Sequence, residues 1–206
     1  MAADGTVHVV DDDEAMRDSL SLLLGAAGLN VAAYPSAEAF LITAPHGAGC
    51  VVIDVQMPGM GGLQLQEELV RRGRRIPVIV MTGHAEVPLA VKAMKAGAVD
   101  FVEKPFEEQA MLAAIRRAFS LGLETARAEA EGNQIGTRLA QLTPREREVL
   151  DALVAGKPNK IIAYDLSISP RTVEIHRARV MEKMEARTLS DLVRMALSVG
   201  LRPKPA

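Results

Sequence analysis

Residues 50–62 have the sequence CVVIDVQMPGMGG, in which an apolar run ends at Asp54 and a turn rich in glycine and proline follows. A short apolar run bounded by turn residues is typical of a strand buried on both faces of a parallel sheet. In open α/β sheets the carboxyl ends of such strands form the edge that carries the binding site. We therefore expect Asp54 at the functional edge of a parallel sheet.

Three further apolar runs also end in polar residues. The runs and the residues that follow them are 7–10 with Asp11 and Asp12, 78–81 with Thr82, and 101–103 with Lys104. Because parallel strands end at a common edge, we expect a cluster of carboxylates, a hydroxyl and an ammonium group there.

Strand and helix patterns alternate through the first half of the chain. Periodicity predicts strands near 7–10, 30–34, 51–55, 77–81 and 100–103, and helices near 14–27, 36–42, 63–72, 88–96 and from about 107. Right-handed crossovers place such helices on both faces of a sheet. The fold class predicted for this half is α/β, with a five-stranded, doubly wound parallel sheet.

The expected cluster suits phosphoryl transfer. Asp11, Asp12 and Asp54 are hard oxygen donors of the kind that Mg²⁺ or Mn²⁺ prefers. Lys104 offers a positive charge to phosphate, and Thr82 can donate a hydrogen bond to it. Since both of these groups could flank Asp54, the residues favour Asp54 as the acceptor that forms an aspartyl phosphate. The simpler interpretation is a buried ion pair between Lys104 and one aspartate.

The chain is predicted to be entirely helical from Leu142 onward. Thr143-Pro144-Arg145-Glu146 is a capping box, and helices are expected near 144–155, 159–166, 170–184 and 188–199. Two helices joined by a short turn, the second of them basic, are typical of a helix-turn-helix that binds DNA. The DNA contacts predicted on this basis are Lys160, Arg171, Thr172, Glu174, Ile175, Arg177, Ala178 and Arg179. The alternative for these residues is a solvated helix surface.

Charge and composition agree with this division. Residues 1–137 have a net charge of −7 and residues 138–206 one of +5, which suggests that only the second part meets a polyanion. The sequence has a single cysteine, no apolar run long enough to span a membrane and no secretion signal. We therefore expect a cytoplasmic protein.

The segment between the two halves is predicted to be partly helical. The helix that starts near residue 107 is expected to pass Gly122 and to end near Gly132, with a flexible break at 132–136. The predicted domains are 1–122, a linker at 123–140, and 141–206.

The first half resembles the receiver domain of two-component response regulators over residues 5–120. The matching motifs are Val9-Val10-Asp11-Asp12, Asp54 with Met57-Pro58-Gly59-Met60-Gly61-Gly62, Thr82-Gly83-His84, and residues 98–106. The resemblance implies a flavodoxin-like fold in which Asp54 accepts phosphate from a histidine kinase. It also implies that Thr82 and Lys104 hold the phosphoryl oxygens and that the chain, though self-catalysing phosphotransfer and dephosphorylation, is not otherwise an enzyme.

The same resemblance assigns further roles at this edge. Mg²⁺ would be bound by Asp12, by Asp54 and by the backbone carbonyl of Gln56, with Asp11 assisting through water. Phe101 stands where the family has an aromatic side chain that moves inward together with the hydroxyl residue, Thr82. Gln56 and His84 stand at positions that tune dephosphorylation, although His84 could equally be an exposed loop residue.

Residues 141–201 resemble the four-helix output domain of the LuxR/GerE family. The motifs that carry the resemblance are residues 142–150, 159–163, 169–176 and 181–184. It implies DNA binding, with the final helix as the surface through which two such domains pair. Glu174 departs from the family, which often has a basic residue there, and this puts its base-reading role in doubt.

Residues 83–88 and 96–101 narrow the resemblance to the nitrogen-fixation regulators of rhizobia. This implies an oxygen-sensing haem histidine kinase as phosphodonor, a homodimer when phosphorylated, promoter DNA and RNA polymerase as partners, and activation of transcription. A paralogue that serves another kinase would share the same motifs.

Two other functions remain open on the sequence. The acids that follow the first strand could belong to a phosphatase with an aspartyl nucleophile, whose turnover would survive Asp54→Ala but not Asp11→Ala. The helical half could instead bind RNA or a protein, and salt-dependent binding to duplex DNA would argue against that.

Overall fold

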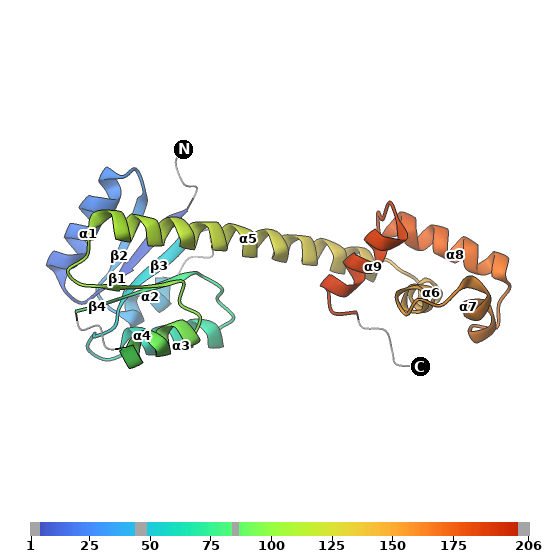
Figure 1. The fold of residues 1–206 in the computed structure, drawn as a ribbon, viewed down its shortest axis with the longest axis horizontal. Helices are drawn as coiled ribbons and strands as arrows, with labels where there is room; N and C mark the ends of the chain where they lie inside the picture. The colour runs from blue at the N-terminus through green and yellow to red at the C-terminus, as the bar shows by residue number, and fades with distance from the viewer. Residues whose placement is uncertain (1–4, 44–48, 84–86, 202–206) are drawn as a thin grey trace. The chain divides into compact units, whose positions relative to one another are not determined.

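The computed structural model describes residues 5–43, 49–83 and 87–201, which form two compact units, Met1–Ala126 and Arg127–Ala206. Figure 1 labels the elements along the chain. His84 lies outside the described residues. No helix within the described ranges is long and apolar enough to cross a membrane.

The first unit contains the predicted five-stranded parallel sheet, in the order β2-β1-β3-β4-β5. Its strands are β1 (Thr6–Val10), β2 (Asn30–Tyr34), β3 (Gly49–Asp54), β4 (Val78–Thr82) and β5 (Asp100–Glu103). In register, Val10 pairs with Ile53, Ile53 with Val80, and Val80 with Phe101. Because these pairs lie at one level, the polar residues that follow the strands lie along one edge, and the predicted fold class is confirmed.

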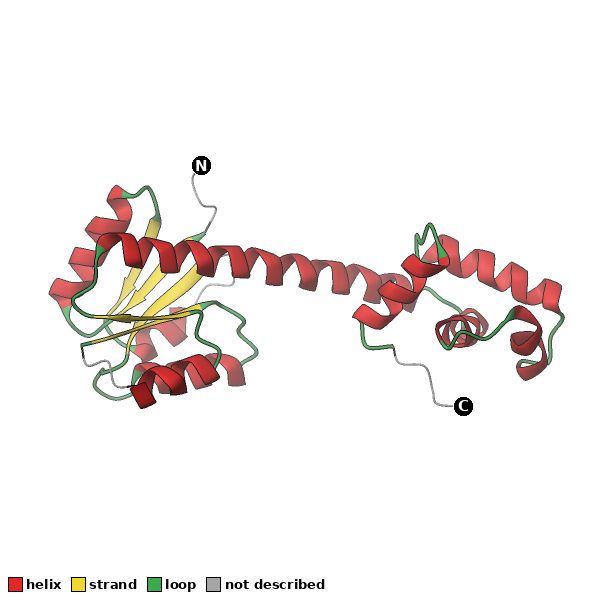
Figure 2. Cartoon of the chain, viewed as in Figure 1, coloured by secondary structure: helices red, strands yellow, loops and turns green. Residues whose placement is uncertain are grey.

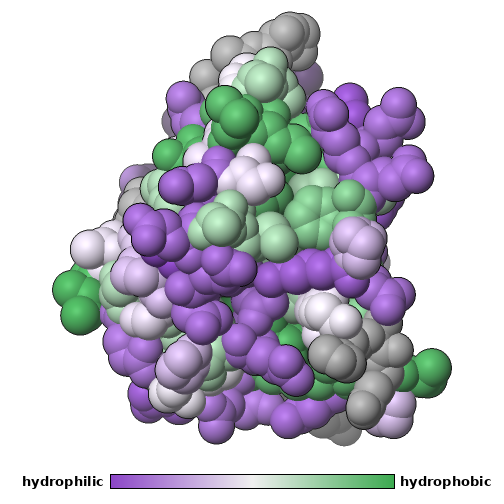
Figure 3. Space-filling model, turned by 90° about the vertical axis from the view of Figure 1, so that its left-hand side faces the viewer, coloured by the Kyte–Doolittle hydropathy of each residue, from purple (hydrophilic) through white to green (hydrophobic). Residues whose placement is uncertain are grey.

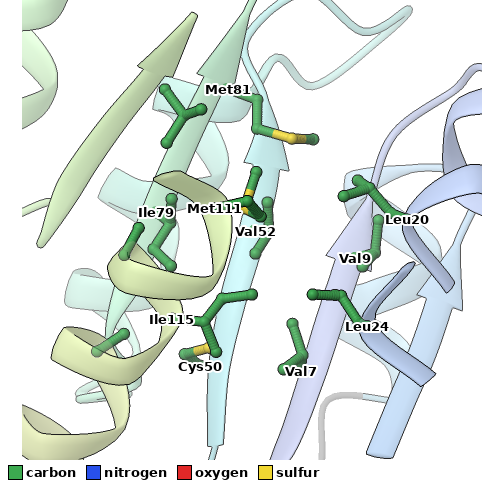
Figure 4. Packing of buried hydrophobic residues seen from close by; sticks show 13 residues of the cluster. Val7, Val9, Leu20, Leu24, Cys50, Val52, Ile79, Met81, Met111 and Ile115 are labelled. Atoms are coloured by element: carbon green, nitrogen blue, oxygen red, sulfur yellow. The ribbon is translucent and has the colours of Figure 1, made fainter. Parts of the chain in front are cut away.

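Helices cover both faces of this sheet (Figure 2). They are α1 (Glu14–Ala26), α2 (Ala37–Thr43), α3 (Gly62–Arg71), α4 (Val87–Lys95) and the start of α5 (Glu108–Ala140). Figure 4 shows Met111 of α5 over Val52 of β3, and Leu24 of α1 beside Val7 of β1, in one core cluster. A second cluster joins the opposite face to α2, α3 and the single buried residue of α4, Ala93. The central strands β1, β3 and β4 are therefore buried from both sides, which explains their apolar sequences.

The second unit is the predicted helical half. Its helices are α6 (Pro144–Val154), α7 (Asn159–Asp165), α8 (Pro170–Lys183) and α9 (Leu189–Ser198). The predicted capping box is present, since the Thr143 hydroxyl accepts from the backbone of Glu146 and the Glu146 carboxylate accepts from the backbone of Thr143. Ser167, at φ 54°, makes the tight turn between α7 and α8. Val149, Leu150 and other apolar side chains of these helices form one core cluster.

The predicted flexible break at 132–136 is wrong, because α5 continues without interruption to Ala140. Ile135 is buried in the core cluster of the second unit, and Leu139 packs against it. Arg138 donates to Glu185 at 2.5 Å. These contacts outweigh the low helix propensity of Gly132 and Gly136, since propensity is a weak determinant where a helix face is packed.

Candidate functional site

The edge of the sheet brings together three of the predicted residues. Asp11 follows β1, Asp54 ends the neighbouring strand β3, and Lys104 follows β5. The Lys104 Nζ lies 2.7 Å from Asp11 Oδ2 and 2.7 Å from Asp54 Oδ1. Both aspartates are buried, with exposed fractions of 1% and 5%. A single ammonium thus bridges two buried carboxylates that would otherwise repel each other.

Backbone groups fix the other carboxylate oxygens. Asp54 Oδ2 accepts from the Gln56 amide at 2.8 Å, and Asp11 Oδ1 accepts from the Asp13 amide at 2.9 Å. Asp13 in turn caps α1, accepting from the amide of Ala15. The sequence therefore positions both acids locally, by a turn after each strand, before Lys104 reaches them from a distant segment.

The electrostatics of the cluster follow from burial and pairing. Burial raises the pKa of Asp54 above its ordinary value, against the opposing hydrogen bond from Lys104. Burial acts to lower the pKa of Lys104, but its hydrogen bonds to Asp11 and Asp54 outweigh this, so its pKa is raised. Lys104 therefore keeps its proton and can neutralise negative charge at Asp54.

Thr82 and Phe101 lie on the two strands beside this cluster. Thr82 is the last residue of β4 and is buried, and its carbonyl accepts from the Lys104 amide at 2.7 Å. Phe101 is half-buried on β5 and packs against the core cluster beneath α4. The hydroxyl-bearing residue and the lysine are thus joined directly through the backbone.

The cluster can bind a divalent cation through a small number of protein ligands. Asp12 and Gln56 are exposed at this edge, next to the buried Asp11 and Asp54. Among the described residues no three carboxylate, imidazole or thiol groups converge into a complete metal cage. Mg²⁺ does not need one, because it usually takes one or two carboxylates together with waters and phosphate oxygens. The donor set of hard oxygens therefore suits Mg²⁺ or Mn²⁺.

The predicted DNA contacts lie on α7 and α8. Arg171, Glu174, Ile175, Ala178 and Arg179 are exposed on α8, and Lys160 is exposed on α7, while Thr172 and Arg177 are half-buried. The buried residues of α8 are Val173 and Val180, which belong to the core cluster. The Thr172 hydroxyl lies 2.8 Å from that of Ser169, within the helix cap. The exposed residues of α8 form one face of the helix that is available to a partner.

Two residues that support these sites were not predicted. Arg17 of α1 donates through Nη1 to the backbone carbonyl of Asp11 at 2.8 Å. Lys183 of α8 donates to the buried carboxylate of Glu146 at 2.6 Å. A basic residue one turn into the helix after the acids was a possible signal for Arg17. The contact of Lys183 joins residues 37 apart and had no local signal.

Comparison with known proteins gives two family matches. Residues 7–116 match the response regulator receiver domain, and residues 140–196 match the bacterial regulatory proteins of the luxR family.

Related proteins match nearly the whole chain. The transcriptional regulatory protein FixJ of Azorhizobium caulinodans is 54% identical over 96% of this chain and 94% of its own length. FixJ of Rhizobium meliloti is 54% identical over 97% of this chain and 98% of its own. Among solved structures, the response regulator StyR has a TM-score of 0.81 at 41% identity, covering 94% of this chain and 98% of that one.

Proposed function

This chain belongs to the response regulators that combine a receiver domain with a LuxR-type DNA-binding domain, and we propose that phosphorylation of Asp54 controls its binding to DNA. The FixJ transcriptional regulators are its homologues. The observation that carries the proposal is the ammonium of Lys104, which lies 2.7 Å from one oxygen of Asp54 and 2.7 Å from Asp11. A buried aspartate with a shared counter-ion is equipped to accept negative charge and to hold it.

The transfer step uses the carboxylate of Asp54 as nucleophile. One of its oxygens forms the bond to phosphorus while the bond to the leaving group breaks, and the leaving group keeps that electron pair. The side chains of Lys104 and Thr82 hold the phosphoryl oxygens. Their hydrogen bonds stabilise the negative charge of the phosphoryl group, which the carboxylate alone cannot carry. Mg²⁺ would be held by Asp12, Asp54 and the carbonyl of Gln56, with Asp11 assisting through water, and would supply charge neutralisation.

Phosphorylation would then change the surface of the first unit. The modification adds about −1.5 to −2 charges at pH 7, which attracts Thr82 and Lys104. Phe101 follows Thr82 inward and alters the face formed by α4 and β5, where two phosphorylated receivers pair. If active and resting conformations are populated at about 1:99, reversing this ratio needs about 5.5 kcal/mol of free energy in favour of the active conformation. New charge-assisted hydrogen bonds to the phosphoryl group can supply it.

The paired chains bind a two-fold DNA site through α8. Arg171, Arg177 and Arg179 suit guanine edges or phosphates, Ile175 or Ala178 suits a thymine methyl, and Lys160 suits a phosphate. Thr172 suits the DNA backbone. Glu174 suits a cytosine amine by its chemistry, although it stands where the family often has a basic residue. The exposed Leu189 and Leu197 on α9 form the surface through which the two output domains pair.

The biological setting is proposed from the homologues. It is activation of nitrogen-fixation or microaerobic genes, with a FixL-like haem oxygen sensor as the histidine kinase and RNA polymerase as the partner on the promoter. For the domains we propose a receiver at 1–122, a helical linker at 123–140 and a DNA-binding domain at 141–206.

The phosphoacceptor is tested by mass spectrometry. The chain is incubated with acetyl phosphate and Mg²⁺ and digested, and the peptide that contains Asp54 is expected to gain the mass of one phosphoryl group. Asp54→Asn serves as the matched control, since it removes the nucleophile and keeps the size of the side chain. Equal labelling of this variant at another residue would refute the assignment.

A further inference from the structure

Helix α4 is held to the first unit by few buried contacts. Of its nine residues, Ala93 is the buried one, whereas α3 buries Gly62, Leu65, Gln66 and Leu69. The large apolar residues Val87, Val91 and Met94 of α4 are exposed. Leu89 and Ala90 are only half-buried, so α4 has less hydrophobic free energy opposing its displacement than α3 has.

A buried polar contact supplies part of the missing attachment. The side-chain Nε2 of Gln66, 1% exposed, donates to the backbone carbonyl of Ala93 at 3.2 Å. The same carbonyl accepts from the amide of Ala98 at 3.1 Å, where the chain leaves α4. Gln66 thus joins α3 to the last turn of α4. The nearby ion pair between Lys92 and Glu67, at 3.7 Å, is exposed on both sides and stabilises little.

The Gln66 amide is only half satisfied. Its Oε1 is buried and has no hydrogen-bond partner among the described residues. The amide cannot be turned over to relieve this, because the Ala93 carbonyl only accepts and must face the nitrogen. A buried acceptor without a donor is costly, and such groups in folded proteins call for an explanation.

We propose that Gln66 is a positioning residue that holds α4 in its unphosphorylated place. The bond from Nε2 to the Ala93 carbonyl sets the position of the helix and outweighs the cost of the orphaned Oε1. A displacement of α4 breaks this bond. This deepens the proposed function, on which it rests, because it names the residue that sets the resting state of the α4–β5 face.

Hydrogen exchange of the full-length, unphosphorylated chain tests the contact directly. Gln66→Met keeps the length of the side chain but removes both polar atoms, so the amides of residues 90–98 should exchange about two- to tenfold faster, the factor for one net hydrogen bond. Glu67→Gln is the matched control on the same helix and should change exchange less than about twofold. Unchanged exchange in Gln66→Met would overturn the proposal.

Two further measurements separate this proposal from the function on which it rests. Gln66→Asn is a second variant for the case that Gln66→Met does not fold. It keeps the amide but is one methylene too short to reach Ala93, so it should also accelerate exchange of these amides. The unphosphorylated Gln66→Met chain should also dimerise about two- to tenfold more tightly than the wild type, in sedimentation experiments that include phosphorylated wild type. If the wild type dimerises on phosphorylation but the variant has an unaltered dimerisation constant, the proposed role of Gln66 is refuted and the proposed function is not. Wild type that never pairs would sink the proposed dimer, and the exchange data would still decide on the Gln66 contact.

Discussion

At the scale of single residues, the chemistry depends on Lys104 and the two acids that it joins. The placement of Asp11, Asp54 and Lys104 was predictable from the sequence, because each follows a buried parallel strand and such strands end at one edge. Gln66 was not predictable, because its bond goes to the backbone carbonyl of Ala93, 27 residues away, which only the tertiary fold places within reach. Arg17 was missed although its bond to the carbonyl of Asp11 is local, six residues apart.

Lys104→Met should reduce the rate of phosphorylation by acetyl phosphate by about 10²-fold or more, since it removes a charged donor from the position where negative charge develops. The rate is measured with excess Mg²⁺ by the appearance of the phosphorylated chain. Lys95→Met makes the same substitution at an exposed lysine of α4 and should leave the rate unchanged. A Lys104→Met chain that folds and is phosphorylated at the wild-type rate would contradict the role given to the ammonium.

At the scale of elements, start signals were more reliable than stop signals. The N-cap residues Thr143 and Ser169 begin α6 and α8 as predicted, because a cap acts through its own backbone neighbours. The end of α5 was misjudged, because burial of Ile135 in the second unit extends the helix through two glycines. A helix end set by tertiary packing leaves no local mark in the sequence.

Thr143→Ala should lower the free energy of unfolding of the second unit by about 1 kcal/mol, the usual cost of losing an N-cap. The measurement is urea denaturation of the full chain, followed by hydrogen exchange of the backbone amides of α6 at each urea concentration. Thr137→Ala, on the exposed side of α5, should change that free energy by less than about 0.5 kcal/mol. Equal effects of the two substitutions would show that the cap does not stabilise α6.

The Glu146 carboxylate makes the second unit sensitive to acid. Hydrogen bonds from Lys183 and then from the Thr143 amide lower its pKa from 4.5 to about 2. A folded-state pKa below the unfolded one gives stability that is present above about pH 4.5 and is lost as the pH falls toward 2. In Glu146→Gln the stability of the second unit should therefore fall less steeply between these pH values, as measured by urea denaturation at each pH. A wild-type slope in the variant would contradict this assignment.

Arg177→Ala should weaken binding to promoter DNA by about 1–3 kcal/mol and leave phosphorylation of Asp54 unaltered, if Arg177 contacts a base or phosphate as proposed. Fluorescence anisotropy with labelled duplex, at one fixed salt concentration, gives the two affinities. Arg116→Ala, an exposed arginine of the first unit, is the control and should bind as the wild type does. An unchanged footprint for Arg177→Ala would mean that another face meets the DNA.

At the scale of the whole molecule, chemistry and recognition are divided between two units of opposite charge. The first unit, Met1–Ala126, has 10 Lys+Arg against 16 Asp+Glu, a net charge of −6, and the second, Arg127–Ala206, has 14 against 10, a net charge of +4, so a polyanion is attracted to the second unit and repelled by the first. One group added to Asp54 can therefore influence DNA binding only by changing how the chains assemble or expose the second unit. The central claim is that this single modification controls occupancy of DNA.

The most direct test is a gel-shift titration of promoter DNA with wild type and Asp54→Asn, each with and without acetyl phosphate and Mg²⁺. We predict that the phosphodonor tightens binding of the wild type and yields a complex with two chains per site, whereas Asp54→Asn binds equally weakly in both conditions. Wild type that binds as a single chain with the same affinity in both conditions would contradict the account.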